Sequence, residues 1–185
     1  MREIKLRGII LKLNKIDLGS RGVVILIDYV DANIDETKLI FSMRNDIKIR
    51  ECMHNQDEIS WKNHLIFMRD LASRKDRQYF LVKQDNYYIG SIYFTNLDNK
   101  NKVAYFGLYA NQFEGIYGVG DILCTTCISY AFDVLGLRKL KLEVFAKNIK
   151  ARKLYARMKF KEFVENNNGI VGMELTNDRY NTVVA

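Results

Sequence analysis

The sequence has no proline, three cysteines, two histidines and one tryptophan among its 185 residues. Without proline, rigid linkers and polyproline ligand segments are excluded. Three cysteines are too few, and odd in number, for the disulfide framework of a secreted domain. No apolar run approaches the roughly 20 residues of a membrane span, and no signal-peptide core follows the first residues. We therefore expect a soluble, cytoplasmic protein without a membrane partner.

The residues that are present indicate one ordinary globular domain. Hydrophobic residues make up 48% of the chain and charged residues 28%, which argues against intrinsic disorder. A chain of this length can bury about two thirds of its unfolded surface and so hold a sizeable core. No segment repeats, and no break in composition marks a second domain. We predict a single domain over residues 1–185, with residues 1–30 as a lead-in of unassigned role.

The charge balance favours an anionic partner. Lysine and arginine total 29 against 22 for aspartate and glutamate, a formal net charge of +7. The basic residues are scattered, with one local cluster between Arg138 and Lys153. We therefore expect a phosphate-bearing ligand near this cluster. Nucleic acid, a phosphorylated cofactor and a nucleotide-linked substrate all remain open at this point.

Two of the cysteines have a spacing that invites a chemical interpretation. Cys124 and Cys127 match a redox pair or half of a zinc site, but a second pair is absent and both histidines, His54 and His64, lie far upstream. In a helix the two cysteines are one turn apart, within an apolar pattern that continues on both sides. We therefore predict buried helix residues in preference to chemistry, and no metal site.

Hydrophobic periodicity predicts a mixed α/β (α+β) architecture. We expect helices over residues 35–45, 58–73, 120–135 and 148–158, and strands over 23–30, 79–82, 88–94, 103–109, 140–145, 160–164 and 170–175. Asp57 or Ser60 could cap the second helix. The three strands between residues 79 and 109 are separated by short turns and predict an antiparallel meander. The helix and strand that follow add a βαβ unit to its end.

A glycine-bearing segment opens the third predicted helix. Gly118 and Gly120 allow a tight turn that presents backbone N–H groups to an anion at the helix N-terminus. A dinucleotide fingerprint would require a further glycine where Leu123 stands, and the Gly-Lys-Ser/Thr of a P-loop is absent. The segment therefore predicts a phosphate cradle of another kind, with a plain turn into the helix as the alternative.

A second motif follows the next strand, and together the two motifs carry a family resemblance. The motif Asn-x-x-Ala-x-x-Leu-Tyr is present as Asn148, Ala151, Leu154 and Tyr155, and the aromatic Phe160 follows. With the Gly-x-Gly helix before it, the sequence resembles the GCN5-related N-acetyltransferase (GNAT) superfamily over about residues 39–175. Two positions depart from the family pattern. Gly115 stands where a Gln or Arg is usual, which removes one phosphate contact, and Lys159 stands where a glycine is common.

Within the superfamily, several segments resemble the N-acetyltransferases of bacterial pseudaminic acid biosynthesis. They are residues 43–45, 51–54, 61–67, 78–82 and 106–109. These enzymes acetylate the 4-amino group of a UDP-linked 4-amino-4,6-dideoxy-N-acetyl-altrosamine that is destined for flagellin or surface glycans. Ribosomal-protein and polyamine acetyltransferases share the Arg-Asn helix and the overall layout, so a protein N-terminus or a polyamine remains an alternative acceptor.

The resemblance implies a GNAT fold and a place for acetyl-CoA. The mixed central sheet would begin with the antiparallel meander, splay between its fourth and fifth core strands and carry helices on both faces. The pyrophosphate would lie on the amides of the glycine loop, and backbone groups of the splayed strand would hold the pantetheine and polarise the thioester. The implied cofactor-binding residues are Leu108, Tyr109, Gly118, Val119, Gly120, Asn148 and Lys153.

Acetyl transfer to an amine needs a base for the amine and an acid for the leaving thiolate. Tyr155 occupies the family's acid position, with ring packing as its alternative role. Glu143 is the candidate base, acting directly or through water, and a salt bridge to Lys141 or a nearby arginine is the competing account. Implied substrate-side residues are Arg44, Met53, His54, His64, Phe67 and Tyr105. His64 lies on an apolar helical face, which favours a core histidine over a catalytic one.

No cysteine matches a family nucleophile position, so we expect direct transfer in a ternary complex. The expected partners are acetyl-CoA and a UDP-amino-sugar, and nucleic acid is not expected. The oligomeric state stays open, a homodimer included. A different class of function, a non-catalytic binding module that uses the same basic surface, remains as a competing hypothesis.

Overall fold

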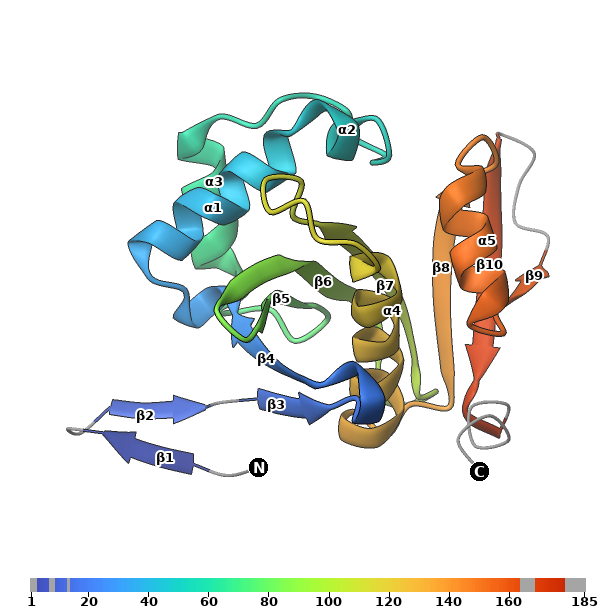
Figure 1. Cartoon of the computed structure of the whole chain (residues 1–185), viewed down its shortest axis with the longest axis horizontal. Helices are drawn as coiled ribbons and strands as arrows, with labels where there is room; N and C mark the ends of the chain where they lie inside the picture. Colours follow the sequence, from blue (N-terminus) through green and yellow to red (C-terminus); the bar gives the residue numbers. More distant parts are fainter. Residues whose placement is uncertain (1–2, 7–8, 13, 164–168, 179–185) are drawn as a thin grey trace.

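The computed structural model describes residues 3–6, 9–12, 14–163 and 169–178 (Figure 1). Its strands are β1 (Glu3–Leu6), β2 (Ile9–Lys12), β3 (Asn14–Asp17), β4 (Val23–Asp28), β5 (Gln78–Gln84), β6 (Tyr87–Asp98), β7 (Val103–Ala110), β8 (Lys139–Phe145), β9 (Lys161–Phe163) and β10 (Ile170–Thr176). Its α-helices are α1 (Ile34–Asn45), α2 (Ile47–Arg50), α3 (Trp61–Leu71), α4 (Val119–Ser129) and α5 (Ile149–Arg157). No helix in this part of the chain has the length and hydrophobicity of a membrane span.

The described strands from β3 onward form one eight-stranded sheet in the order β3-β4-β5-β6-β7-β8-β10-β9. Strands β4 to β7 pair antiparallel in sequence order, as the meander predicts, and β7 pairs parallel with β8 after the crossover through α4. β1 and β2 form a separate two-stranded ribbon, which projects from the body in Figure 1. Part of the predicted lead-in, β3 and β4, thus belongs to the main sheet.

The parallel pairing of β7 with β8 is short. It runs from Val103 opposite Lys139 to Tyr105 opposite Lys141, and in the described chain it extends no further. Beyond these residues the two strands diverge, as Figure 1 shows. Counted from β4, they are the fourth and fifth core strands, so the predicted splay is confirmed. The separation leaves the outer edge of β7 from Phe106 onward without β8 as a partner.

The two faces of the sheet carry separate hydrophobic cores. On one face α4 packs against β6 and β7, and its residues Leu123, Cys124 and Cys127 are fully buried. The prediction that these cysteines are helix core residues is therefore confirmed. The other face carries α1, α2 and α3, with Ile40, Met43 and Met68 among the buried residues. α2 and α5 lie on opposite faces of the sheet. Residues of both helices line the region where β7 and β8 separate.

Local sequence explains the helix boundaries. Asn33 caps α1 in a capping box with Glu36, so this helix begins at Ile34, one residue earlier than predicted. Ser60 caps α3, which begins at Trp61 and not at the predicted Glu58. α4 ends at Ser129 and continues as a π-helical turn, Tyr130–Val134, where an unbroken helix was predicted. The prediction missed α2 altogether, and it ended β6 four residues before Asp98.

Candidate active site

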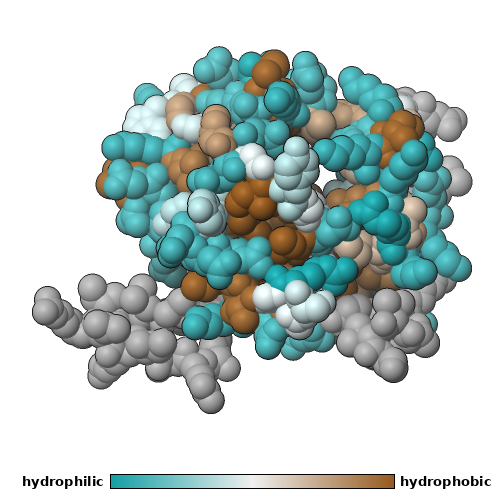
Figure 2. All heavy atoms as spheres, viewed as in Figure 1, coloured by the Kyte–Doolittle hydropathy of each residue, from teal (hydrophilic) through white to brown (hydrophobic). Residues whose placement is uncertain are grey.

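A cleft opens where β7 and β8 separate, with a cavity volume of 1320 Å³. Its lining comes from α2 and the following residues, from β6 and β7, from the loop before α4, and from β8 and α5. Figure 2 shows that hydrophobic residues gather near the middle of the face seen in Figure 1, on an otherwise largely hydrophilic surface. Drug-sized ligand pockets are commonly about 300 to 1,000 Å³, so the cleft is large enough for more than one small substrate.

The N-terminus of α4 forms one end of the cleft. Gly118 caps this helix in the left-handed conformation with φ of 76°, which favours glycine, and the first turn presents backbone N–H groups of Gly118, Val119 and Gly120. Asp121, in the same turn, is neutralised by Arg157 of α5 at 2.6 Å. The amides and the helix dipole can therefore attract an anion without opposition from an unpaired carboxylate.

The splayed edge of β7 forms the floor. Leu108 and Tyr109 line the cleft, as predicted, but the Tyr109 side chain is buried beneath it. Its hydroxyl lies 2.9 Å from that of Tyr29, which is 2.6 Å from Ser91 Oγ. Burial raises the pKa of both tyrosines, so this network stays protonated at neutral pH. Tyr109 can therefore serve a ligand only through its backbone.

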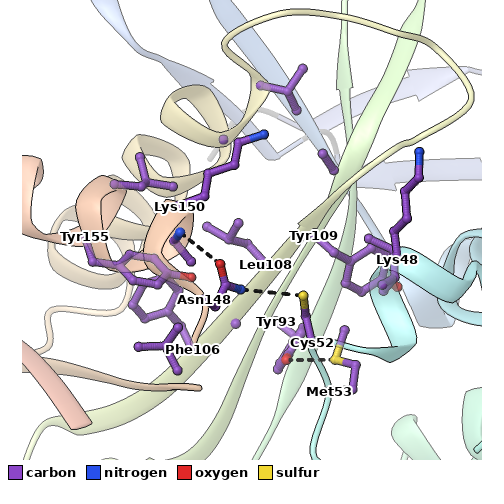
Figure 3. Close-up of a pocket in the computed structure, with 18 of the residues that line it drawn as sticks. Lys48, Cys52, Met53, Tyr93, Phe106, Leu108, Tyr109, Asn148, Lys150 and Tyr155 are labelled. Atoms are coloured by element: carbon purple, nitrogen blue, oxygen red, sulfur yellow. Dashed lines mark hydrogen bonds between the residues drawn. The ribbon is translucent and has the colours of Figure 1, made fainter. Parts of the chain in front are cut away.

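The first turn of α5 joins the two walls of the cleft. The Asn148 side chain caps the helix by accepting from Ala151 N–H at 3.1 Å. Its Nδ2 also donates to Cys52 Sγ at 3.5 Å, so the segment after α2 is held against α5 (Figure 3). Asn148 thus lines the cleft as predicted and also fixes the distance between the walls. Cys52 is an exposed free thiol that lines the same cleft.

Tyr155 lies on the α5 wall and is 7% exposed. Its ring packs edge-on against Phe106 and Phe160, with centroids 5.9 Å away in both cases. Burial is the main cause that raises the pKa of its hydroxyl well above the usual value, so the group remains protonated and can donate a proton. Both suggestions from the sequence, ring packing and a position in the site, apply to this residue.

Glu143 lies on the β8 wall, on the face opposite to Tyr155. Its neighbours Leu142 and Val144 are buried in the core beneath α4, so alternation turns Glu143 toward the α2 side. Its Oε2 lies 2.9 Å from His54 Nε2. The competing account predicted a salt bridge from Glu143 to Lys141 or a nearby arginine; in the structure the ion pair of Glu143 is with His54, and Lys141 Nζ lies 4.6 Å from the centre of the Phe163 ring.

Aromatic side chains and Met53 form the rest of the α2 side. Met53 and Tyr105 line the cleft, and so does Tyr93 of β6. The Tyr93 ring stacks on Tyr79 with centroids 5.1 Å apart, and its hydroxyl donates to Met53 Sδ at 3.9 Å (Figure 3). Gly107 makes this possible, because a Cβ at that position would overlap the end of the Tyr93 side chain.

Four residues predicted for the site do not line the cleft. Lys153 is exposed on α5, and Phe67 packs edge-on against Tyr79. His64 is 2% exposed, its Nε2 lies 3.2 Å from Thr37 O, and burial lowers its pKa, as expected for a core histidine. Arg44 donates to Asn55 O at 2.8 Å and so supports the loop after α2. A direct ligand contact by any of the four remains a prediction.

Sequence reasoning missed several side chains that line the cleft. They are Lys48, Cys52, Tyr93, Asp121 and Arg157. Lys48 and Cys52 belong to or follow α2, which is too short to produce a periodic signal. Lys150 belongs to the basic cluster near which we expect a phosphate-bearing ligand, and it lines the cleft as well. Arg157 lies just beyond that cluster. The absence of a Gln or Arg at Gly115 is the one sequence feature that indicates a cation from elsewhere in the chain.

The geometry so described is that of an acyl-transfer site. It combines an anion-binding helix N-terminus, a splayed strand edge, a protonated tyrosine on one wall and a carboxylate–imidazole pair on the other. Residues 42–160 match the acetyltransferase (GNAT) family, and this match covers more than half of the chain. The protein therefore belongs to this family, whose members use acetyl-CoA, and is an N-acetyltransferase.

Individual relatives narrow the likeness. Acetyltransferase PseH of Campylobacter jejuni is 39% identical over 133 residues, which cover 72% of this chain and 82% of that protein. The crystal structure of C. jejuni N-acetyltransferase PseH in complex with acetyl coenzyme A matches with a TM-score of 0.69 and 33% identity, over 83% of this chain and 99% of that chain.

A more distant structure shares only the fold. The spermidine N-acetyltransferase of Vibrio cholerae, in complex with CoA and spermine, has a TM-score of 0.72 but 18% identity. The match covers 85% of this chain and 97% of that chain. The structure with the higher TM-score thus has the lower sequence identity. Similarity of the backbone alone therefore does not indicate which acceptor this protein uses.

Proposed function

We propose that this protein transfers the acetyl group of acetyl-CoA to the 4-amino group of a UDP-linked 4-amino-4,6-dideoxy sugar. The sequence resemblance to the pseudaminic acid N-acetyltransferases suggests this acceptor, and the likeness to C. jejuni PseH supports it. The reaction would proceed directly between the two substrates in the cleft.

The charge of the cleft is the observation that carries the proposal. The ammonium and guanidinium groups among the described lining residues are those of Lys48, Lys150 and Arg157. Its carboxylates, Asp121 and Glu143, are both engaged, with Arg157 at 2.6 Å and His54 at 2.9 Å. A polyamine would need unpaired carboxylates to bind its ammonium groups, whereas CoA and a UDP-sugar bring phosphates. The cleft therefore suits two anionic substrates.

Two basic side chains are suitably placed to attract them. Lys48 of α2 and Lys150 of α5 extend from opposite walls of the cleft in Figure 3. Lys150 lies on the helix that carries Tyr155, nearer the proposed CoA end, and Lys48 lies on the side of Met53 and Tyr93. We assign Lys48 to the diphosphate of the acceptor. The aromatic groups beside it would cover the sugar.

An acceptor screen tests the proposal. Thiol release from acetyl-CoA is followed with the UDP-amino-sugar, the same amino-sugar without UDP, spermidine and an N-terminal peptide. We expect kcat/KM for the UDP-sugar to exceed the others by about 100-fold or more, because the site would otherwise leave charged groups unpaired. Lys48→Gln should raise KM for the UDP-sugar and leave acetyl-CoA affinity unchanged. A preference for spermidine or the peptide would refute the assignment.

A further inference from the structure

The contact between His54 and Glu143 suggests catalytic roles that differ from those the sequence implies. The sequence resemblance implies that Glu143 is the base and that His54 contacts the substrate. In the structure the two side chains meet at 2.9 Å, although 89 positions separate them in sequence. We propose that His54 is the general base and that Glu143 is a positioning residue that holds its imidazole. This inference rests on the proposed function, because it concerns the amine of that acceptor.

The contact itself determines which nitrogen is available. Glu143 Oε2 accepts from His54 Nε2–H, since an ionised carboxylate can only accept. Nδ1 then carries the lone pair that can receive a proton. A carboxylate that holds one imidazole nitrogen fixes the tautomer and stabilises the imidazolium that forms when the other is protonated. The dyad therefore has the arrangement of an oriented base.

The position of His54 fits this task. His54 and Glu143 line the same cleft as Tyr155. Cys52, two positions before His54, is held 3.5 Å from Asn148 Nδ2, and Asn148 caps the helix that carries Tyr155. The His54 segment is thereby fixed against the acid-bearing wall. Acid and base then lie on opposite sides of the cleft, as transfer from a thioester to an amine requires.

Chemistry also favours the imidazole over the carboxylate. A histidine side chain titrates in the neutral range and a glutamate well below it, so imidazole is the stronger base for an ammonium group. Glu143 Oε2 is moreover engaged by His54, which reduces its access to a substrate amine. With 63% of its side chain exposed, His54 can exchange its proton with water after each turnover.

The step balances without another reactant. As the amine nitrogen forms its bond to the acetyl carbon, the carbon–sulfur bond of acetyl-CoA breaks. The amine proton passes to His54 Nδ1, and the departing thiolate takes the proton of the Tyr155 hydroxyl. His54 releases its proton to solvent and Tyr155 regains one, so the net transfer is one proton from amine to thiol.

Other charged groups face this dyad and enter its pH dependence. Lys48, Cys52 and Tyr93 share its wall of the cleft. Lys147 Nζ lies 5.7 Å from the centre of the Phe145 ring, and the centroid of that ring is 5.8 Å from that of His54. Lys48 and Lys147 are thus two cations near the dyad. Substitutions at the dyad are therefore compared with each other, at constant salt.

The test is the pH profile of kcat/KM with acetyl-CoA and the UDP-amino-sugar. His54→Asn keeps a donor for Glu143 but cannot titrate. We expect about a 100-fold loss at neutral pH, which shrinks toward alkaline pH as more of the acceptor amine becomes neutral. Imidazole in solution should partly restore His54→Ala. Glu143→Gln should cost about tenfold, as is common for partners that orient a functional histidine, and should keep the acidic limb.

The controls separate this inference from the proposed function. Glu162→Gln, which breaks an exposed pair with Arg152 at 2.7 Å, is the matched control for Glu143→Gln and should leave the profile unchanged. If Glu143→Gln abolishes the acidic limb while His54→Asn retains it, Glu143 is the base and the inference fails. A loss in His54→Asn that is equal at every pH also overturns it. If the wild-type protein does not acetylate the UDP-sugar, the proposed function fails, and the inference fails with it.

Discussion

Gly107 and Tyr93 form the tightest match between a residue and its space in the cleft. Gly107 has no side chain, and the end of the Tyr93 side chain occupies the position that a Cβ would take. Tyr93 is in turn stacked on Tyr79 and bonded to Met53, so it cannot move away freely. The glycine is thus required by the aromatic wall and not by a positive φ.

Gly107→Ala should therefore destabilise the fold by about 1 to 3 kcal/mol, the usual cost of overpacking. The urea midpoint measures this change at constant m value. In a Tyr93→Ala background Gly107→Ala should cost less than in the wild-type protein, because the space is vacant there. Gly120→Ala is the control, since its Cβ would lie 3.4 Å from a Leu154 methyl group, an ordinary contact. Equal effects of the two glycine substitutions would rule out the steric account.

Tyr155 is the proposed acid, and it is both part of the hydrophobic core and a residue that lines the cleft. Tyr155→Phe keeps the ring contacts with Phe106 and Phe160 and removes only the proton donor. We expect kcat to fall by about 100-fold, a typical share for general acid catalysis, with acetyl-CoA affinity nearly unchanged by calorimetry.

Tyr130→Phe supplies the matched control for this substitution. It is a buried tyrosine of the same core and lies outside the cleft lining, and it donates to Gln78 at 3.1 Å. Its substitution should leave kcat unchanged within about twofold, because the lost hydrogen bond lies outside the cleft. The expected cost is about 1 kcal/mol in the free energy of unfolding. An unchanged kcat in Tyr155→Phe, under conditions where chemistry limits turnover, would exclude Tyr155 as the acid.

At the scale of elements, the contact between α4 and α5 determines the charge of the first turn of α4, which we expect to bind phosphate. Asp121 would repel phosphate if it were alone, and Arg157 neutralises it from 36 positions away in sequence. Arg157 and Gly115 line the same cleft. A residue of α5 thus sets the charge at the start of α4.

Arg157→Gln should weaken acetyl-CoA binding by about fivefold, because one uncompensated charge near the surface is worth about 1 kcal/mol. Asp121→Asn in the same chain should restore most of this loss. Calorimetry at low and high salt measures both effects, which should shrink as salt screens them. If the double variant binds as weakly as Arg157→Gln alone, Arg157 contacts the phosphate itself and the neutralisation account is wrong.

Most elements of this fold are predictable from the sequence because each leaves a local signal. The meander alternates with period two, the βαβ unit follows, and Gly118 and Asn148 mark two helix starts. α2 has only four residues, less than the length over which periodicity is visible. The contacts of the residues that follow α2, such as Cys52 with Asn148 and His54 with Glu143, were therefore not predicted.

The same distinction applies to the candidate site: positions set by local signals are predictable, and contacts between distant segments are not. Backbone positions such as Gly118 and Leu108 are set by their own elements, and both line the cleft. The contacts of Cys52 with Asn148 and of His54 with Glu143 join distant segments across the splayed sheet. No local pattern encodes such pairs, because they depend on how α2 and α5 pack over opposite faces. From the sequence, His54 and Glu143 could each be proposed for the site, but their contact with each other could not be predicted.

At the scale of the molecule, the splayed sheet joins two binding regions into one space. The α4 end supplies amides for an anion, and the α2 side supplies aromatic groups and Lys48, within one cavity of 1320 Å³. The two substrates can therefore meet in the cleft without an acetylated enzyme intermediate. The one thiol exposed among the described residues, Cys52, also lines this cleft, so direct transfer has to be distinguished from transfer through Cys52.

Initial-velocity kinetics make this distinction. Direct transfer in a ternary complex predicts double-reciprocal lines that intersect, because both substrates must be bound before a product leaves. The same pattern should persist in Cys52→Ala, although its rate can change through the lost contact with Asn148. Transfer through Cys52 would instead give parallel lines in the wild-type protein. It would also leave an acetylated Cys52, detectable by mass spectrometry after incubation with acetyl-CoA alone, and would abolish turnover in Cys52→Ala.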